Sequence, residues 1–299
     1  MTATDSDSDT STGTGTGTGT DTDSHSHTDA ATDTNSHTDL LLISAQRTST
    51  ALLLTEAARR RGMATRVFDG RPADRVAGPG EAVHWQGGPL LADKVAGPLG
   101  LGLLEPPDGW LTELPREFTR RRITLEPFSS VCREVFAPVF LKPPSDKSFR
   151  PGVYGDPERG FSDLARTLPP HTPVLVSDPV TFTAEYRLFV LDGQVVTGSR
   201  YAVHGRLDPG PLTPDARRFG AELLAAAGGS LPSAVVVDAG PLEDGGWAVV
   251  EANMAWFAQC YAADPDAVLD VVLRAAGPRE RVAERDRSFL RVTSREASG

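Results

Sequence analysis

Short apolar runs and helix-like segments alternate along the chain from residue 39 onward. Residues 40–45 and 64–68 have the composition of buried strands, and residues 50–61 between them carry apolar side chains at helical spacing. This strand–helix–strand order predicts a right-handed parallel crossover. Two further short strands, at 81–85 and 101–104, would complete a small parallel-sheet α/β domain.

Beyond this region the pattern changes from helices to strands and hairpins. An arginine-rich stretch at 110–128 is predicted to be helical, and β-rich runs follow at 133–144, 173–180 and 184–203. The Asp192-Gly193 pair inside the last run is typical of a two-residue hairpin.

A well-punctuated helix and a last hairpin follow these strands. Thr213 can cap the helix, Pro214 suits its first position, and Gly228-Gly229 can end it. The hairpin spans residues 233–256, and a short helix is expected after Asp264-Pro265. The pattern as a whole predicts an α/β domain followed by an α+β region.

The two ends of the chain differ in composition from the rest. Residues 1–38 are Thr, Ser, Asp, Gly and His with almost no apolar side chains, so ordering them would cost entropy without burying surface. We expect a disordered tail, in which His25 and His27 either contact a metal ion or are simply solvated. Residues 276–299 are mostly charged and are expected to form a surface tail.

Composition excludes several classes of function. The formal net charge of -10 comes largely from the first 38 residues, which hold seven Asp and no Lys or Arg, so the remainder is only mildly acidic. That balance argues against nucleic-acid partners, which need a basic face. No apolar run is long enough to span a membrane and no secretory signal is visible, so we expect a cytoplasmic protein. The turn at 44–50 has no glycine, which disfavours a dinucleotide site.

The last hairpin carries the clearest chemical signal. An Asp244-Gly245 turn would place Asp238 directly opposite Glu251, and a Gly245-Gly246 turn would place it opposite Asn253. Either register puts the three side chains on one face of the sheet. Facing carboxylates repel each other, and two carboxylates with an amide oxygen suit Mg²⁺. The alternatives are a solvated sheet face, or an arginine paired with one of the acids.

Three further features admit both a functional and an ordinary interpretation. Lys142 ends an apolar strand beside a loop that bears Lys147, so it can either bind phosphate or extend from a strand edge into solvent. Glu185 and Arg187 share one strand face, as an ordinary ion pair also would. An apolar strand stops at Pro179, which frees backbone groups near residue 178 to meet a planar base.

Taken in chain order, these features resemble the ATP-grasp superfamily. The resemblance covers roughly residues 113–275, and its most specific part is the final D-x-G…V-E-x-N hairpin. The KPxxxKSF and EYRLFVLDG strings look like a bacterial and phage clade of that superfamily. It implies a pre-ATP-grasp domain at 39–108 and, at 109–275, an ATP-grasp fold of two α+β subdomains that clasp ATP.

The resemblance also implies roles for individual residues. Lys142, with Lys147 near it, matches the lysine that contacts nucleotide phosphates, and Arg121 matches a second phosphate residue, for which Arg120 and Arg122 are alternatives. The remaining roles are a hinge that meets adenine through its backbone, an acid on the ribose, one or two Mg²⁺ and a cation at the transferred phosphoryl group. Matched to these roles are, in order, Val176, Ser177 and Asp178; Glu185; Asp238, Glu251 and Asn253; and Arg200.

One position departs from the ligases of this superfamily that join D-amino acids. They carry an arginine two residues before the first metal acid, where this chain has Val236. An arginine there would stabilise an oxyanion, so Arg187 or Arg200 would have to supply the charge, or the acyl-transfer step differs.

The implied activity is that of an ATP-dependent carboxylate–amine ligase that works through an acylphosphate, with ATP and Mg²⁺ and with small-molecule carboxylate and amine substrates. A kinase that phosphorylates a small molecule, and a non-catalytic nucleotide-binding regulatory module, are the alternatives. The sequence identifies neither the substrates nor the oligomeric state.

Overall fold

The computed structural model describes residues 39–46, 48–70, 76–78, 80–134, 137–144, 148–155 and 161–292. All of them belong to one unit, His37–Gly299. The expected disordered tail at 1–38 and the predicted phosphate residue Lys147 lie outside the described residues.

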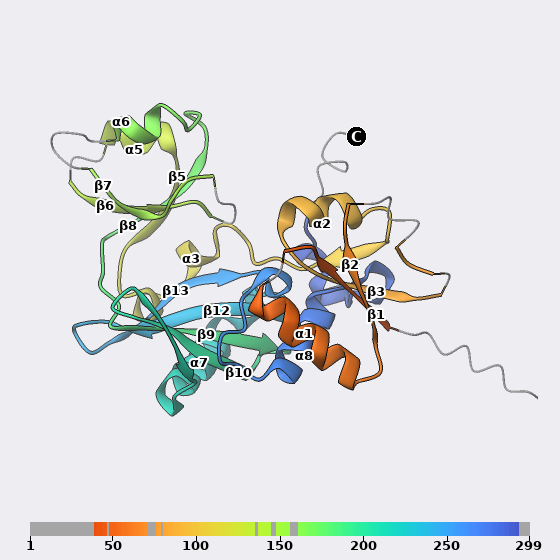
Figure 1. Ribbon diagram of the computed structural model, residues 1–299. Helices are drawn as coiled ribbons and strands as arrows, with labels where there is room; N and C mark the ends of the chain where they lie inside the picture. Colours follow the sequence, from red (N-terminus) through yellow and green to blue (C-terminus); the bar gives the residue numbers. More distant parts are fainter. Residues whose placement is uncertain are drawn as a thin grey trace, which may run out of the picture. The chain divides into compact units, whose positions relative to one another are not determined.

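The described chain opens with the predicted parallel sheet (Figure 1). Its order is β2 (Ala64–Phe68), β1 (Asp39–Ser44), β3 (Ala82–Gln86), and all pairings are parallel. Helix α1 (Ser49–Arg60) makes the crossover from β1 to β2 and begins where the Thr48 side chain accepts a hydrogen bond from the Ala51 amide. Helix α2 (Pro89–Val95), which we did not predict, follows β3.

A four-stranded antiparallel sheet forms the next layer. Its order is β5 (Ile123–Pro127), β8 (Pro173–Ser177), β6 (Val139–Lys142), β7 (Gly152–Tyr154). One face packs on α5 (Phe128–Glu134) and α6 (Ser162–Ala165), with a core that includes Phe128, Leu141 and Val174. Leu175 points to the opposite face and joins a different core.

A five-stranded antiparallel sheet carries the longest strands. Its order is β11 (Arg206–Pro211), β10 (Gln194–Val203), β9 (Ala184–Leu191), β12 (Ala234–Pro241), β13 (Trp247–Asn253). The predicted Asp192-Gly193 hairpin joins β9 to β10, and both residues have the positive φ that a type I′ turn requires. The predicted helix is α7 (Pro214–Ala227), capped by the Thr213 side chain.

The two faces of this sheet are buried differently. Leu188 and Val237 face α7, α3 (Trp110–Glu113) and α4 (Arg116–Thr119) in one core. Phe189 and Val236 face the other way and pack with β1, α1 and α8 (Pro265–Ala275). Helices α1 and α8 lie side by side (Figure 1), where Arg60 pairs with Asp266 at 2.6 Å. Further along the same face the side chains become polar, at Arg187 and Asp238.

The predicted helix at 110–128 is wrong in its second half. Pro115 separates α3 from α4, and Arg120 ends α4 in the left-handed conformation, with φ of 55°. The chain then enters strand β5. The run of arginines carries a helical composition but no interruption signal other than the proline, and pairing with β8 decides the outcome.

The expectation of a charged tail at 276–299 does not hold for residues 276–292. Strand β14 (Ala276–Pro278) pairs with β4 (Leu101–Leu103), so β4 lies outside the parallel sheet. Short 3₁₀ helices follow at Arg279–Arg281 and Glu284–Phe289, and others lie at Gly228–Ser230 and Ala255–Phe257. Asp286 is 1% exposed and accepts hydrogen bonds from the amide and hydroxyl of Ser233.

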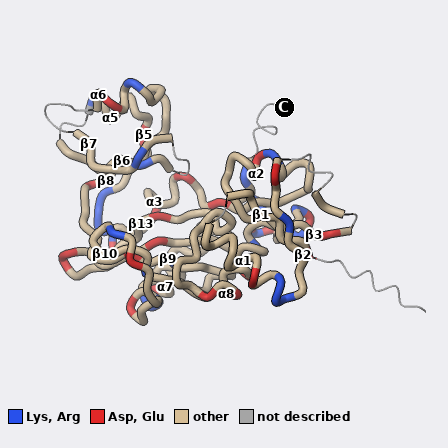
Figure 2. The backbone as a smooth tube through the Cα atoms, viewed as in Figure 1, with Lys and Arg blue, Asp and Glu red and all other residues tan. Residues whose placement is uncertain are grey.

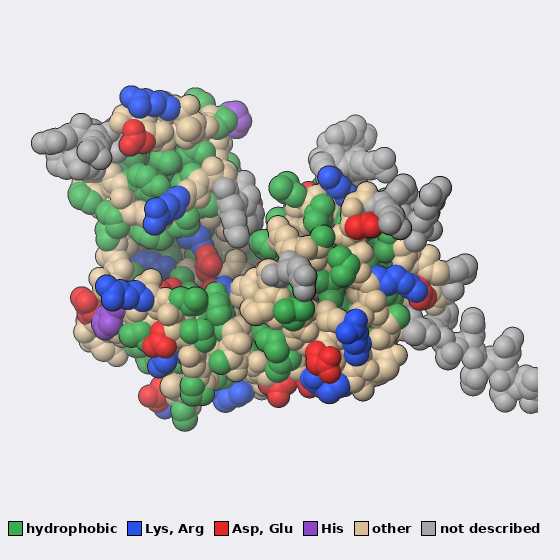
Figure 3. All heavy atoms as spheres, in the orientation of Figure 1, with side chains coloured by type: hydrophobic (Ala, Val, Ile, Leu, Met, Phe, Trp, Pro, Cys, Tyr) green, Lys and Arg blue, Asp and Glu red, His purple; other side chains and the backbone are tan. Residues whose placement is uncertain are grey.

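Charged residues of both signs are interspersed along the described chain (Figure 2) and on the face drawn in Figure 3. Neither view shows a broad surface of a single sign. Across the described part of the chain, no helix combines the length and the apolar character that a membrane crossing requires.

We predict that Asp286→Ala lowers the free energy of unfolding by about 1–3 kcal/mol, because it leaves the buried amide and hydroxyl of Ser233 without an acceptor. Chemical denaturation measures this. Glu284→Ala, at an exposed position of the same segment, should change stability little. Equal stability of both variants would show that the segment is dispensable.

We also predict that stability falls as the pH is lowered through the range where histidine titrates. His84 is buried, its Nδ1 lies 2.9 Å from the Leu273 carbonyl, and burial lowers its pKa although Asp39 opposes this. The unfolded chain therefore takes up a proton at a pH where the folded chain does not, and the folded state loses stability. His84→Asn should flatten the melting temperature between about pH 7.5 and pH 5.5. An unchanged slope would contradict this.

Candidate functional site

A buried ion pair between two neighbouring strands forms the centre of the site. Arg187 on β9 lies directly opposite Asp238 on β12. The guanidinium donates from Nε and Nη2 to the two carboxylate oxygens, at 2.9 and 2.7 Å. Asp238 is 1% exposed and Arg187 is 9% exposed, so the pair is almost shielded from solvent. One of the interpretations left open by the sequence, an arginine on one of the acids, is thus present.

A second ion pair joins the two antiparallel sheets. Lys142, the last residue of β6, contacts the Glu251 carboxylate on β13 through its ammonium. Glu251 also accepts a hydrogen bond of 2.7 Å from the amide of Asn253. The predicted phosphate lysine and two of the predicted metal ligands are therefore in direct contact or one hydrogen bond apart.

The predicted register of the last hairpin is correct, but the turn is different. Asp238 pairs with Glu251, as an Asp244-Gly245 turn would require. The strands actually end at Pro241 and Trp247, and residues 242–246 form the loop. A β-bulge between Asp238 and Ala239 shifts the ladder by one residue and restores the predicted pairing.

Aromatic side chains surround the Arg187 guanidinium. The rings of Tyr201 and Tyr261 stack with centroids 5.3 Å apart, and the guanidinium lies 5.4 Å from each ring centroid. The Tyr201 hydroxyl donates to Glu185 at 2.7 Å. We did not predict either tyrosine. Tyr201 is the extra residue of a second bulge, and Tyr261 has a φ of 51°, neither of which the sequence pattern signals.

The electrostatics of the cluster follow from burial and from its two cations. Burial alone would lower the pKa of Arg187, but the Asp238 carboxylate outweighs it and raises the pKa, so the guanidinium stays charged. Burial acts to raise the pKa of Glu251, yet the Lys142 ammonium holds it below its usual value. Burial raises the pKa of Glu185, against the Tyr201 hydrogen bond.

The donor set fits a cation at Glu251 and Asn253. Three carboxylates, from Glu185, Asp238 and Glu251, face only two cationic side chains. The Lys142 ammonium already occupies a cation position on Glu251, and carboxylate and amide oxygens are the ligands that Mg²⁺ prefers. Asp238 is less available, because both of its oxygens accept from Arg187. In the described part of the chain, no three His, Cys, Asp or Glu side chains converge as a ready metal site.

The structure does not bring Arg200 to this cluster. Arg200 pairs with Tyr186, which faces the α7 core, while Arg187 faces the opposite way. Its guanidinium donates to the backbone and side chain of Asp208, both at 3.1 Å. The bulge at Tyr201 prevents alternation along β10 from carrying Arg200 to the site face.

Arg121, expected to bind phosphate, instead has backbone partners. Its buried guanidinium donates to the carbonyls of Thr119, Val249 and Val250. Neighbouring Arg120 pairs with the exposed Asp244.

The predicted adenine hinge has fewer free backbone groups than expected. Strand β8 is paired on both sides through Ser177, and the Asp178 amide donates to the Arg122 carbonyl. A cavity of about 240 Å³ borders Val176, Ser177 and Asp178. Val176 pairs with Leu141, whereas Leu175 pairs with Lys142, so the cavity on the Val176 side and the Lys142 ammonium lie on opposite faces.

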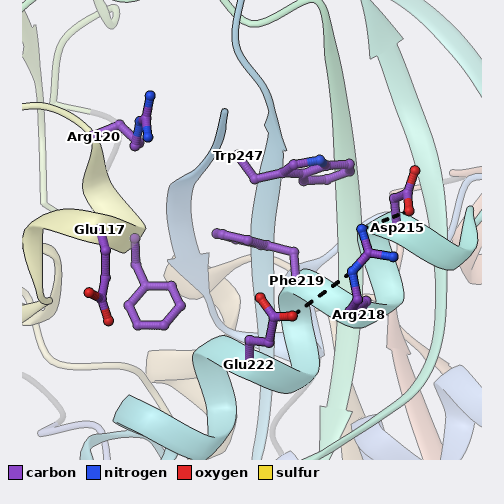
Figure 4. Close-up of a pocket in the computed structure, with 8 residues that line it drawn as sticks. Glu117, Arg120, Asp215, Arg218, Phe219, Glu222 and Trp247 are labelled. Atoms are coloured by element: carbon purple, nitrogen blue, oxygen red, sulfur yellow. Dashed lines mark ion pairs between the residues drawn. The ribbon is translucent and has the colours of Figure 1, made fainter. Parts of the chain in front are cut away.

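A separate pocket of about 320 Å³ lies on the α7 side of the five-stranded sheet (Figure 4). The rings of Phe219 and Trp247 stack in it, and Arg218 pairs with Asp215 at 2.8 Å. None of the residues predicted to bind nucleotide or metal lines this pocket.

Comparisons with known proteins agree with this geometry. A family model for an ATP-grasp domain, the second family of its clade, matches residues 118–271, just over half of the chain. None of the curated proteins matches the chain.

Two solved structures have a similar fold. D-cycloserine synthetase DcsG is 17% identical, with a TM-score of 0.53 over 78% of this chain and 98% of that one. D-alanine–D-alanine ligase from Bacillus anthracis is 12% identical, with a TM-score of 0.51 over 82% of this chain and 98% of that one. At these identities the likeness concerns the fold alone.

We predict that Arg187→Met lowers the free energy of unfolding by about 3–5 kcal/mol, because it leaves the Asp238 carboxylate buried without a partner. The double variant Arg187→Met, Asp238→Leu should recover most of this loss, since no charge is then stranded. Denaturant titration of both variants checks the prediction. Arg218→Met, which breaks an exposed pair, is the control and should cost less than about 1 kcal/mol. A double variant no more stable than the single one would contradict it.

Proposed function

Because the chain belongs to this ATP-grasp domain family, we propose that it is an ATP-dependent carboxylate–amine ligase. The observation that carries the proposal is the contact of Lys142 with Glu251, beside Asn253 and the Arg187–Asp238 pair. A phosphate-binding lysine from one sheet thereby meets the metal-type oxygen ligands of the other.

The proposed reaction has two steps, and its substrates are a carboxylate and an amine. A carboxylate oxygen attacks the γ-phosphorus of ATP, the bond between that phosphorus and the β–γ bridging oxygen breaks, and ADP leaves. The amine then attacks the acylphosphate carbonyl, phosphate departs, and the amine nitrogen loses a proton. Phosphoryl transfer of this kind depends mainly on positioning and charge neutralisation, so no protein nucleophile is needed.

Lys142 and Glu251 have complementary roles in this proposal. Nucleotide phosphates compete with Glu251 for the Lys142 ammonium, which sits on a flexible stem and can change partner. Once Lys142 turns to phosphate, Glu251 and Asn253 are left to hold Mg²⁺. When bound, Mg²⁺ would neutralise phosphate charge. Glu185, held by Tyr201 at the edge of the cluster, is the residue that we assign to the ribose.

Arg187 supplies the charge that the family ligases draw from another position. Val236 occupies that position here, and its side chain is fully buried against Phe189 in an apolar core. Arg187 reaches the same carboxylate, Asp238, from the neighbouring strand. Its fixed guanidinium can stabilise the oxyanion that forms when the amine attacks.

We place the protein in the cytoplasm, where ATP and Mg²⁺ are available. Its two cysteines, Cys132 and Cys260, are both free thiols, in keeping with a reducing compartment.

We predict that Glu251→Gln lowers ATP turnover by about a hundredfold while the fold is kept, because the amide is a poor metal ligand and loses the Lys142 contact. The assay measures ADP and free phosphate with pools of carboxylates and amines. Glu243→Gln, at an exposed position of the same hairpin, should behave as the parent.

The same assay separates the alternatives. A ligase releases ADP and phosphate only when both substrates are present, a kinase releases ADP without free phosphate, and a binding module releases neither. Normal turnover by Glu251→Gln would remove the basis of the proposed site.

A further inference from the structure

The bulge in β13 decides which way Glu251 points. Side chains alternate along a strand, so Val249 and Glu251 would normally lie on the same face. Val249 pairs with Ala239 and is buried in the α7 core, whereas Glu251 pairs with Asp238 on the site face. The extra residue between them, Val250, makes this change of face possible.

The backbone carbonyls at this bulge are bound by Arg121. Its Nη1 donates to the Val249 carbonyl at 2.8 Å, and its Nη2 reaches the Val250 carbonyl at 3.4 Å. The two contacts therefore span the irregular peptide. A guanidinium suits this position because it presents several donors in a fixed plane, which an ammonium does not.

Arg121 is itself held by its surroundings. Arg120 before it adopts a left-handed conformation, which ends α4, and Nη1 of Arg121 also donates to the Thr119 carbonyl at 3.0 Å. The Phe182 ring lies 5.7 Å from the guanidinium carbon. The side chain is buried, and among the described residues it has no carboxylate within ion-pair distance. Burial lowers its pKa to about 10, an unfavourable environment for a charge whose role is merely structural packing.

We propose that Arg121 is a positioning residue that holds the bulge at Val250 and so keeps Glu251 on the site face, opposite Asp238. The proposal replaces the expected contact of Arg121 with nucleotide phosphate. It rests on the proposed function, because its consequence is read through the metal that Glu251 would bind.

The test compares ADP binding with and without Mg²⁺ by isothermal titration calorimetry. For Arg121→Lys, we expect metal-free ADP affinity close to that of the parent and a loss of about 10–100-fold in Mg²⁺ affinity at the ADP-bound protein. A phosphate-binding role would instead weaken ADP binding in the absence of metal. Arg120→Lys, at the neighbouring exposed position, is the matched control and should bind both ligands as the parent does.

A double variant shows whether Arg121 acts through Glu251. With Glu251→Gln already present, adding Arg121→Lys should cause no further loss of Mg²⁺ affinity. Additive losses would overturn the proposal. Full Mg²⁺ affinity in Arg121→Lys, combined with a loss in Glu251→Gln, would overturn the proposal while leaving the function intact.

A crystal structure of ligand-free Arg121→Lys provides a readout that does not depend on the metal. We expect the bulge to move or vanish and Glu251 to leave its place opposite Asp238. An unchanged bulge would overturn the proposal even if the parent bound no Mg²⁺, a result that would separately contradict the proposed function. If Arg121→Lys does not fold, Phe182→Leu removes the ring at the guanidinium without removing a charge and should lower Mg²⁺ affinity in the same direction.

Discussion

The buried pair of Arg187 and Asp238 is the interaction on which the site depends. Burying a carboxylate and a guanidinium is costly, and the cost is offset here by two aligned hydrogen bonds and by the faces of Tyr201 and Tyr261. The pair lies where one sheet face passes from an apolar core to a polar surface. It thus fixes a permanent positive charge at a place to which Glu185 and Glu251 add negative charge.

The Lys142–Glu251 contact differs from this central pair in kind. It consists of one flexible ammonium on one carboxylate, and it connects β6 of the four-stranded sheet to β13 of the five-stranded sheet. Any anion that binds Lys142 must compete with Glu251, and any cation that binds Glu251 must compete with Lys142. Nucleotide and metal would therefore assist each other, because each releases the partner that the other needs.

The sequence was sufficient for features that depend on local chemistry, and insufficient where strands become irregular. The crossover at β1–α1–β2, the Asp192-Gly193 turn and the Thr213 cap follow from residue preferences, and the structure confirms them. The pairing of Asp238 with Glu251 was predicted from a two-residue turn that does not exist, and a bulge restores it. Arg200 was assigned to the site by the resemblance, and a bulge that no residue type announces directs it away. Bulges arise from pairing between distant segments, so local patterns do not reveal them.

The pairing of β4 with β14 has a consequence for how the protein is made. Residues 276–278 supply the edge that β4 lacks, and α8 fills the core under β1, so the first domain of the chain is completed by nearly the last residues. On the ribosome, the nascent leading domain must wait with an incomplete interior while both antiparallel sheets are synthesised. Those sheets behave as an insertion within an earlier unit, and a chaperone that shields the waiting surface would act on residues 39–104 rather than on the catalytic region.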